Sequence, residues 1–336
     1  MLKSIIIRTA MAVPTLFGLL VLAFLLIYSV PSDPAAALAG DNATPEQIAA
    51  IRAKYGFDQP LHIQFGIYLR DVLTLDFGVS SYSQREVMTD IGVRLPATLE
   101  LTVSALFIAS VVGIPLGVIA AIHHNRTLDF VTRFFATTGV AIASFWLAIM
   151  LQLAFSMVLE WLPLRGQLSS GMSAPLGPTR LISIDSIIHG RWDVLLNFLQ
   201  HLALPAITLA LGPMATLARF TRAAMLETLQ KEFILYERSV GYPRRRLIWR
   251  YALRNALITP ITQIGLLFGA LIAGAVVVES VFDWPGMGNY IVQAILTSDY
   301  KVMLACTLVI GAIYIFVNLA ADIILGLVDY RLRDRG

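Results

Sequence analysis

The chain has 336 residues, of which 57% are hydrophobic and only 14% are charged, and its mean hydropathy is +0.74. Soluble domains carry about 25% charged residues, so this composition excludes a disordered chain, a collagen-like chain and a disulfide scaffold, and it disfavours an ordinary cytosolic enzyme. The formal net charge of +3 is too small to indicate a nucleic-acid partner, and a single cysteine, Cys306, excludes an internal disulfide bond.

The hydropathy pattern predicts an all-α integral membrane protein with six transmembrane helices. A helix needs about 20 apolar residues to cross the hydrocarbon core of a bilayer. Five charge-free runs are long enough, and a shorter run that contains two prolines is included because its neighbours require a crossing there. In chain order the six expected spans are Ala10–Val30, Leu101–Ile122, Phe134–Leu159, Leu202–Ala218, Ala256–Val278 and Val302–Ala321.

The first run has a second interpretation as a signal peptide. Lys3 and Arg8 precede it, and Ala37-Leu38-Ala39 resembles a cleavage site. The apolar run is longer than the roughly 7–15-residue core of a signal peptide. We therefore expect a retained membrane anchor.

The basic residues predict that both termini are cytoplasmic. Cytoplasmic segments usually carry an excess of lysine and arginine. With the N-terminus inside, the inside segments carry 16 of the 25 basic residues, and the outside segments carry the other 9. The inside group comprises Lys3, Arg8, Arg126, Arg133, nine residues between Arg219 and Arg254, and Arg331, Arg333 and Arg335.

This topology divides the chain into three parts: residues 1–30, with the N-terminal tail and first span; residues 31–96, an extracytoplasmic segment; and residues 97–336, a core with the other five spans. The core includes an extracytoplasmic loop, 160–201, and a cytoplasmic loop, 219–255. Apolar residues at helical spacing in the first outer segment, with Phe65, Tyr68 and Phe77 among them, predict short helices near the outer membrane surface. Each outer segment is either a docking surface for an external partner or a cover over the bundle.

The cytoplasmic loop 219–255 predicts two helices with a break at Gly241-Tyr242-Pro243. Gly241 suits a helix C-terminus that needs a positive φ, and Pro243 suits the first turn of the next helix. The first helix, around Lys231–Val240, is short and amphipathic, so it could act as a lever on a partner's groove. The plain alternative is a positive-inside loop whose arginines lie at lipid headgroups. Those arginines are Arg244, Arg245, Arg246, Arg250 and Arg254.

Further motifs follow the same topology from one end of the chain to the other. They are VPSDP, YGFDQPLHIQFGIYL, LDFGVS, RLPATLELT, VGIPLGVIAA, LPAIT, ALRNALITPIT and, as the most specific, ESVFDWPGMGNYI from Glu279 to Ile291. In this order they resemble the peptide/nickel (dipeptide–oligopeptide) permease family of ABC importers. The cytoplasmic loop resembles the EAA segment of ABC importer permeases, with YERSVG, Tyr236 to Gly241, in place of a small-residue TARAKG.

The resemblance implies a type I ABC importer permease in the cell inner membrane, with a cytoplasmic coupling helix that contacts an ATPase subunit. The implied partners are a second homologous permease subunit, two ATP-binding subunits that carry ATP and Mg, an extracytoplasmic substrate-binding protein, a peptide substrate and membrane lipid. Dipeptides and oligopeptides are the implied cargo, with nickel, glutathione or opines as alternatives. The implied contact residues are Glu232, Phe233, Tyr236, Glu237, Arg238 and Gly241, and the implied signature turn contains Glu279, Phe282, Trp284, Pro285, Gly286 and Gly288.

The sequence predicts no catalytic residue, no metal site and no cofactor on this chain. It contains no GxxxxGK[ST], HExxH, CxxC or GxSxG motif, and His123-His124 is typical of a solvated inside turn. Its substrate path is not marked by any residue pattern.

The ionisable residues of the expected spans lie at their ends. Glu100 and Glu279 are at outer ends and Asp322 is at an inner end. An ion-coupled secondary transporter, the main rival, needs polar groups near the membrane midplane. A structural or receptor-like membrane protein is a further rival, disfavoured by the family resemblance.

The sequence also supports two local predictions. Trp284-Pro285-Gly286 is typical of a tight turn in which glycine supplies a positive φ, with Trp284 at the membrane interface. Gly265, Gly269 and Gly274 favour close helix packing, either within the chain or between two permease chains.

Overall fold

The computed structural model describes residues 2–28, 35, 43–55, 58–175 and 177–328. Over these residues the protein is all-α, as predicted, and its single β feature is an isolated bridge between Val79 and Glu86. The VPSDP motif, Ala37-Leu38-Ala39 and the C-terminal arginines Arg331, Arg333 and Arg335 lie outside the described residues.

The helices follow one another along the chain with short connections, and two of them, η1 and η2, are π-helical. In order they are α1 (Leu2–Tyr28), α3 (Pro45–Tyr55), α4 (Leu61–Leu73), α5 (Val87–Ile122), α6 (Thr127–Ala141), α7 (Ser144–Leu151), η1 (Gln152–Val158), α8 (Ile182–Ile188), α9 (Trp192–Leu229), α10 (Glu232–Ser239), α11 (Arg244–Arg246), η2 (Leu247–Ala252), α12 (Leu253–Ala256), α13 (Ile258–Phe282), α14 (Met287–Leu296) and α15 (Tyr300–Val328).

Four described helices are long and apolar enough to cross a membrane: α5, α9, α13 and, over Tyr300–Ala321, α15. A fifth crossing exists if α6 and the α7–η1 helix form one span. The first expected span falls in α1, whose described apolar stretch is the shorter Ala10–Leu25. The fifth and sixth expected spans coincide closely with α13 and α15.

The third expected span, Phe134–Leu159, is wrong as a continuous helix. Helix α6 ends at Ala141, Ile142 and Ala143 are both extended, and α7 leaves at an angle of 103° to α6. A charge-free run predicts that a segment lies in lipid, but it does not predict whether the helix is straight. Neither residue of this break is glycine or proline, so the sequence does not mark the bend. The bend is held instead by tertiary packing of α7 against α9 and α13.

Two spans are longer than the sequence indicates. Helix α5 begins at Val87 and continues through Pro96 and Pro115, and α9 has 38 residues and contains Pro205 and Pro213. Neighbouring helices supply the packing that lets membrane helices tolerate prolines. As a result α9 carries its last turns well beyond Ala218, almost to the start of α10.

The centre of the bundle is the contact between α5 and α9, which lie along one another and are packed on by α13. Gly113 and Gly117 of α5 make the approach close, because a Cβ at either would press on the backbone oxygen of Met214 or Ala218. Likewise Gly265 and Gly269 of α13 face α15, at Ala321 and Tyr314. These two glycines therefore serve packing within the chain.

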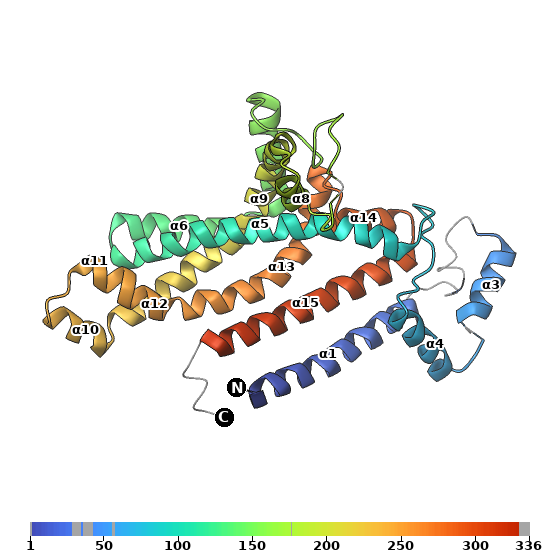
Figure 1. Ribbon diagram of the computed structural model, residues 1–336, viewed down its shortest axis with the longest axis horizontal. Helices are drawn as coiled ribbons and strands as arrows, with labels where there is room; N and C mark the ends of the chain where they lie inside the picture. The colour runs from blue at the N-terminus through green and yellow to red at the C-terminus, as the bar shows by residue number, and fades with distance from the viewer. Residues whose placement is uncertain (1, 29–34, 36–42, 56–57, 176, 329–336) are drawn as a thin grey trace.

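Two pairs of short helices lie at opposite ends of the long ones. Figure 1 shows α10 and α11 at one end and α3 and α4 at the other. Helices α1 and α15 pack side by side, and the start of α1 and the end of α15 both point towards the end that carries α10. The aromatic rings of α4 face α1, with the centroids of Phe65 and Phe24 5.2 Å apart, so this part of the expected outer segment packs against α1.

Candidate functional site

Helix α10 ends in a backbone motif that fixes the direction of the following chain. Gly241 has φ +92°, its N–H donates to the Arg238 carbonyl at 3.1 Å, and the Tyr242 N–H donates to the Glu237 carbonyl at 3.2 Å. This pair of bonds is a Schellman motif, which satisfies carbonyls that the helix leaves unpaired. The predicted glycine break is confirmed, while Pro243 lies one residue before the predicted position, as the N-cap of α11.

The inner side of α10 is anchored to the long helices. Ile234 is 5% exposed and belongs to a cluster with Val118 of α5, Met225 of α9 and Ile248 of η2. Phe233 packs against the same cluster from its edge. Displacing α10 therefore displaces the ends of α5 and α9.

Two tyrosine rings and an arginine contact one another where the chain turns back after α10. The centroids of Tyr242 and Tyr251 are 5.6 Å apart, and the Arg246 guanidinium carbon lies 4.9 Å from the centroid of the Tyr242 ring. Such contacts stabilise a chain reversal beyond its backbone bonds.

The outer side of α10 is uncovered and carries three apolar side chains among charged ones. Leu235, Tyr236 and Val240 are 56%, 69% and 59% exposed. Of the predicted contact residues, Glu232, Tyr236, Arg238 and Gly241 are exposed and Phe233 and Glu237 are partly buried. Leu235 was not among them, although it is an apolar residue next to Tyr236 in the predicted helix.

A second group of residues joins α13 to α14 around the carboxylate of Glu279. This side chain is fully buried and accepts hydrogen bonds from the Thr98 hydroxyl at 2.6 Å and from the N–H groups of Gly288 and Asn289 at 2.7 and 3.2 Å. The Met287 N–H donates in turn to the Thr98 hydroxyl oxygen at 2.8 Å. Glu279 thus ties α5, α13 and α14 together.

Two expectations about this turn were wrong. Trp284 is fully buried, donates its indole N–H to the Ala97 carbonyl at 2.9 Å and packs on Phe198, so it is a core residue and not an interface anchor. The positive φ belongs to Asp283, at +50°, whereas Gly286 has φ −97°. Gly286 is required for space, because a Cβ there would overlap the Glu279 carboxylate. Phe282 and Gly288 are buried beside it, and Pro285 is exposed.

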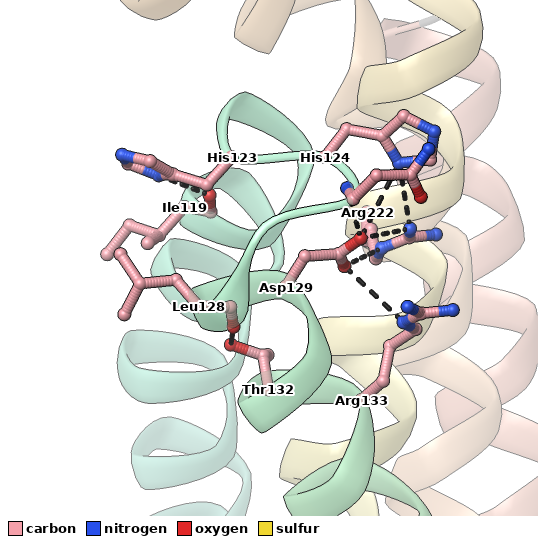
Figure 2. Close-up of polar contacts among 9 residues, drawn as sticks. Ile119, His123, His124, Leu128, Asp129, Thr132, Arg133 and Arg222 are labelled. Carbon is pink, nitrogen blue, oxygen red and sulfur yellow. Dashed lines mark hydrogen bonds and ion pairs between the residues drawn. The ribbon is translucent and has the colours of Figure 1, made fainter.

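A third group, shown in Figure 2, surrounds the carboxylate of Asp129 in the first turn of α6. Arg222 of α9 donates to both oxygens, from Nε at 2.6 Å and from Nη2 at 2.8 Å, and the Asn125 N–H donates to Oδ2 at 3.0 Å. Arg133 and His124 approach the same carboxylate at 3.6 and 3.5 Å. One fully buried acid therefore organises three basic side chains from two helices and a turn.

Two hollows lie along α6 and α9, between the Asp129 group and the bend at Ile142 and Ala143. The first, of about 420 Å³, lies between the two helices and includes Arg133, Arg219 and Arg222. The second, of about 290 Å³, is lined by small and apolar residues of α6, α7, α9 and α13. Val140 borders both hollows.

The part of the chain that the structure describes contains no group of three or more histidine, cysteine or acidic residues that could hold a metal ion.

Comparison with known proteins identifies the family. Residues 113–334 match the binding-protein-dependent transport system inner membrane component family, and residues 1–102 match the N-terminal region of the same class of membrane component. The dipeptide transport system permease protein DppB of Alkalihalophilus pseudofirmus is 36% identical over 97% of this chain and 98% of its own length. The probable D,D-dipeptide permease DdpB of Escherichia coli is 39% identical, over 94% and 93%. The glutathione permease GsiC of Salmonella choleraesuis is 34% identical, over 99% of each.

The fold has a counterpart among solved structures. A chain of the inward-facing MetNI methionine ABC transporter superposes with a TM-score of 0.50 and 16% sequence identity, over 69% of this chain and 93% of the other. The likeness concerns the fold of the permease.

Fold and matches together define a multi-pass inner-membrane component of a transport system. The chain belongs to the binding-protein-dependent transport system inner membrane component family, with residues 113–334 and 1–102 covering nearly all of it. It is the permease subunit of an ATP-driven ABC importer, and it is a transport subunit, not an enzyme.

Proposed function

We propose that this permease subunit moves dipeptides and short oligopeptides into the cell. Relatives that match nearly their full length are named for dipeptides, D,D-dipeptides and glutathione, all of which contain peptide bonds and a free carboxylate. Glutathione is the alternative substrate that this comparison supports, and nickel or opines are family alternatives without such support.

The proposed topology has six spans and cytoplasmic termini. It counts α1 and the bent α6–α7–η1 pair as one crossing each, beside α5, α9, α13 and α15. The start of α1 and the end of α15 share the end that carries α10, which supports placing both termini on the side of the basic loop 219–255. Residues 31–96 and 160–201 are then extracytoplasmic, and residues 97–336 form the permease core.

The proposed coupling helix is α10, and one observation carries this assignment: its inner side packs on α5 and α9, while Leu235, Tyr236 and Val240 on its outer side are exposed. Apolar side chains on a short exposed helix suit insertion into a partner's groove. The proposed contact residues are Glu232, Phe233, Tyr236, Glu237, Arg238 and Gly241, and we include Leu235 because it is exposed beside Tyr236.

The energy for transport comes from the partners. Two ATP-binding subunits carry ATP and Mg on the cytoplasmic side, a second homologous permease completes the pathway, and an extracytoplasmic binding protein delivers the peptide. ATP closes the two ATPase subunits, α10 moves with one of them, and the motion shifts the population between outward- and inward-open states.

Reconstitution of the full complex in vesicles tests this proposal. Wild-type complex should import labelled Ala-Ala only with ATP and the binding protein, and Tyr236→Ala should lower ATP-dependent uptake and co-purification of the ATPase subunits. Tyr82→Ala, at a 51% exposed tyrosine of the outer segment, is the matched control and should behave as wild type. Accumulation of Ala-Ala by the isolated chain under an ion gradient, or undiminished ATPase binding by Tyr236→Ala, would contradict the proposal.

A further inference from the structure

The hollow between α6 and α9 differs in chemistry from the lipid-facing surface of the same bundle. The exposed side of α5 carries Val103, Phe107 and Val111, which suit hydrocarbon. The hollow instead combines small apolar side chains with Thr132, Thr137 and three arginines. Arginine is expensive to place against lipid tails and marks a polar cavity or pathway where it occurs in a membrane bundle.

The three arginines of the hollow carry more positive charge than the neighbouring carboxylate of Asp129 can neutralise. Asp129 is already bonded through both oxygens to Arg222, and Arg133 reaches it only at 3.6 Å. Arg219 lies one turn before Arg222 and its guanidinium carbon is 5.6 Å from the ring centroid of Phe220. Within the described residues no carboxylate lies within ion-pair distance of Arg219. An anionic group is the ligand that this surplus attracts.

Resting on the proposed function, we infer that this hollow is the inner part of the peptide path on this chain and that Arg219 and Arg133 receive the free terminal carboxylate of the peptide. The hollow, at about 420 Å³, falls within the range of about 300–1,000 Å³ typical of small-molecule sites. It shares Val140 with the second, apolar hollow beside the bend, which can accept side chains of varied shape. The terminal carboxylate of a peptide would lie in the hollow with the arginines, and the peptide side chains would lie in the apolar hollow.

Cysteine labelling tests the inference without relying on uptake. Cys306 is the single cysteine of the chain, so Cys306→Ala provides a cysteine-free background. Thr137→Cys places a thiol on the wall of the hollow, and Phe107→Cys places one on the lipid-facing side of α5. The complete nucleotide-free complex, in inside-out vesicles of phosphatidylcholine, is treated with an anionic or a cationic methanethiosulfonate of similar size, and labelling is read on this chain.

The anionic reagent should label Thr137→Cys faster than the cationic one. Adding Arg219→Gln should lower the anion-to-cation rate ratio by about tenfold, since a unit charge at about 6 Å changes the energy of each probe in opposite directions. Arg126→Gln, at an exposed arginine outside the hollow near the same end, is the matched control and should leave the ratio unchanged. Ala-Ala should protect the thiol and its C-terminal amide should not, while Phe107→Cys should stay unlabelled.

Several results would overturn the inference. Equal rates for both reagents, an unchanged ratio in Arg219→Gln, or equal protection by Ala-Ala and its amide would remove the carboxylate site. No labelling at Thr137→Cys would mean that a partner subunit or lipid covers the hollow, and slower labelling in vesicles with anionic lipid, without peptide protection, would assign it to lipid headgroups. Uptake of Ala-Ala is measured on the same preparations: its absence in the wild type refutes the proposed function, whereas uptake without carboxylate-dependent protection refutes this inference alone.

Discussion

Asp129 and Arg222 stand 93 residues apart in the sequence and form a two-point ion pair, with N–O distances of 2.6 and 2.8 Å, between the first turn of α6 and the end of α9. The aspartate side chain is 0% exposed and the arginine side chain is 18% exposed. One turn further along α9, Met225 contacts the cluster that holds Ile234 of α10. The pair therefore lies on a continuous path of contacts from α10 through α9 to α6.

Removing one partner of this pair should destabilise the permease strongly. In Asp129→Ala the Arg222 guanidinium keeps its position but loses a buried counter-ion, a change that costs about 3–5 kcal/mol in buried pairs. We expect a lower melting temperature of the detergent-solubilised complex and a lower amount of the chain in the membrane. Fluorescence-detected gel filtration after heating measures the first, and quantitative immunoblotting the second.

The double substitution separates charge from mere packing. Asp129→Arg with Arg222→Asp keeps one acid and one base between α6 and α9, so it should recover part of the stability that either single reversal loses. Asp193→Ala provides the control, because its ion pair with Arg191 is exposed on both sides, at 56% and 45%, and should contribute little to stability. Double and single variants that lose equal stability would show that the ion pair does not join the two helices.

Gly241→Val should separate ATP hydrolysis from peptide uptake. Gly241 has φ +92° and a Cβ built on it meets nothing within 4 Å, so the substitution acts through the backbone alone. A β-branched residue in the left-handed region costs about 1–2 kcal/mol or more, and it disfavours the turn that sets the angle between α10 and α11. We expect normal insertion, retained ATPase activity and several-fold lower uptake per ATP hydrolysed in reconstituted vesicles.

Gly241→Asn is the matched control, because asparagine tolerates the left-handed conformation better than other side chains. It should retain most of the uptake. Equal uptake by the valine and asparagine variants would mean that the geometry of this turn does not matter for coupling.

Local signals account for the parts of the fold and site that the sequence revealed. Gly241 was readable because a glycine between an amphipathic stretch and a proline marks a helix end, and the long apolar runs of α13 and α15 mark spans by composition alone. The bend at Ile142 and Ala143 carries no such signal, since it results from packing against α9 and α13.

The relationships missed from the sequence are long-range. Asp129 reads as an ordinary acid in the first turn of a helix, and Arg222 as part of a basic loop, until the fold brings them together. The pair His123-His124 lies in a turn, as predicted, with the His124 side chain 48% exposed, but its 3.1 Å contact with the Arg222 guanidinium was not predicted. The role of Gly286 was wrong for the same reason: its constraint is the nearby Glu279 carboxylate and not its own φ angle.

Two adjacent residues of α10 should give opposite results when truncated. Ile234→Ala removes methyl groups from a buried cluster and should cost about 2–5 kcal/mol, which a lower melting temperature would report. Leu235→Ala, at a 56% exposed position, should leave that temperature nearly unchanged but weaken binding of the ATPase subunits in detergent. A Leu235→Ala variant that binds them as tightly as wild type would place the partner interface elsewhere.

Glu279→Gln should destabilise the junction of α5, α13 and α14 although it changes only one atom. The two carboxylate oxygens accept from the Thr98 hydroxyl and from the N–H groups of Gly288 and Asn289. In the variant, the glutamine oxygen can still accept from the two backbone N–H groups, and its NH2 group then faces Thr98. The Thr98 hydroxyl oxygen already accepts from the Met287 N–H, and the hydroxyl proton loses its acceptor. One buried donor without a partner costs about 1–3 kcal/mol.

Gly286→Ala should destabilise the same junction by a comparable amount, because the added Cβ would displace the Glu279 carboxylate. The control is Glu227→Gln, whose side chain is 73% exposed and whose expected effect is within about 0.5 kcal/mol. Thermal unfolding of the solubilised complex compares the three variants. If Glu279→Gln has the same melting temperature as Glu227→Gln and the wild type, the buried carboxylate does not hold the three helices together at this end of the permease.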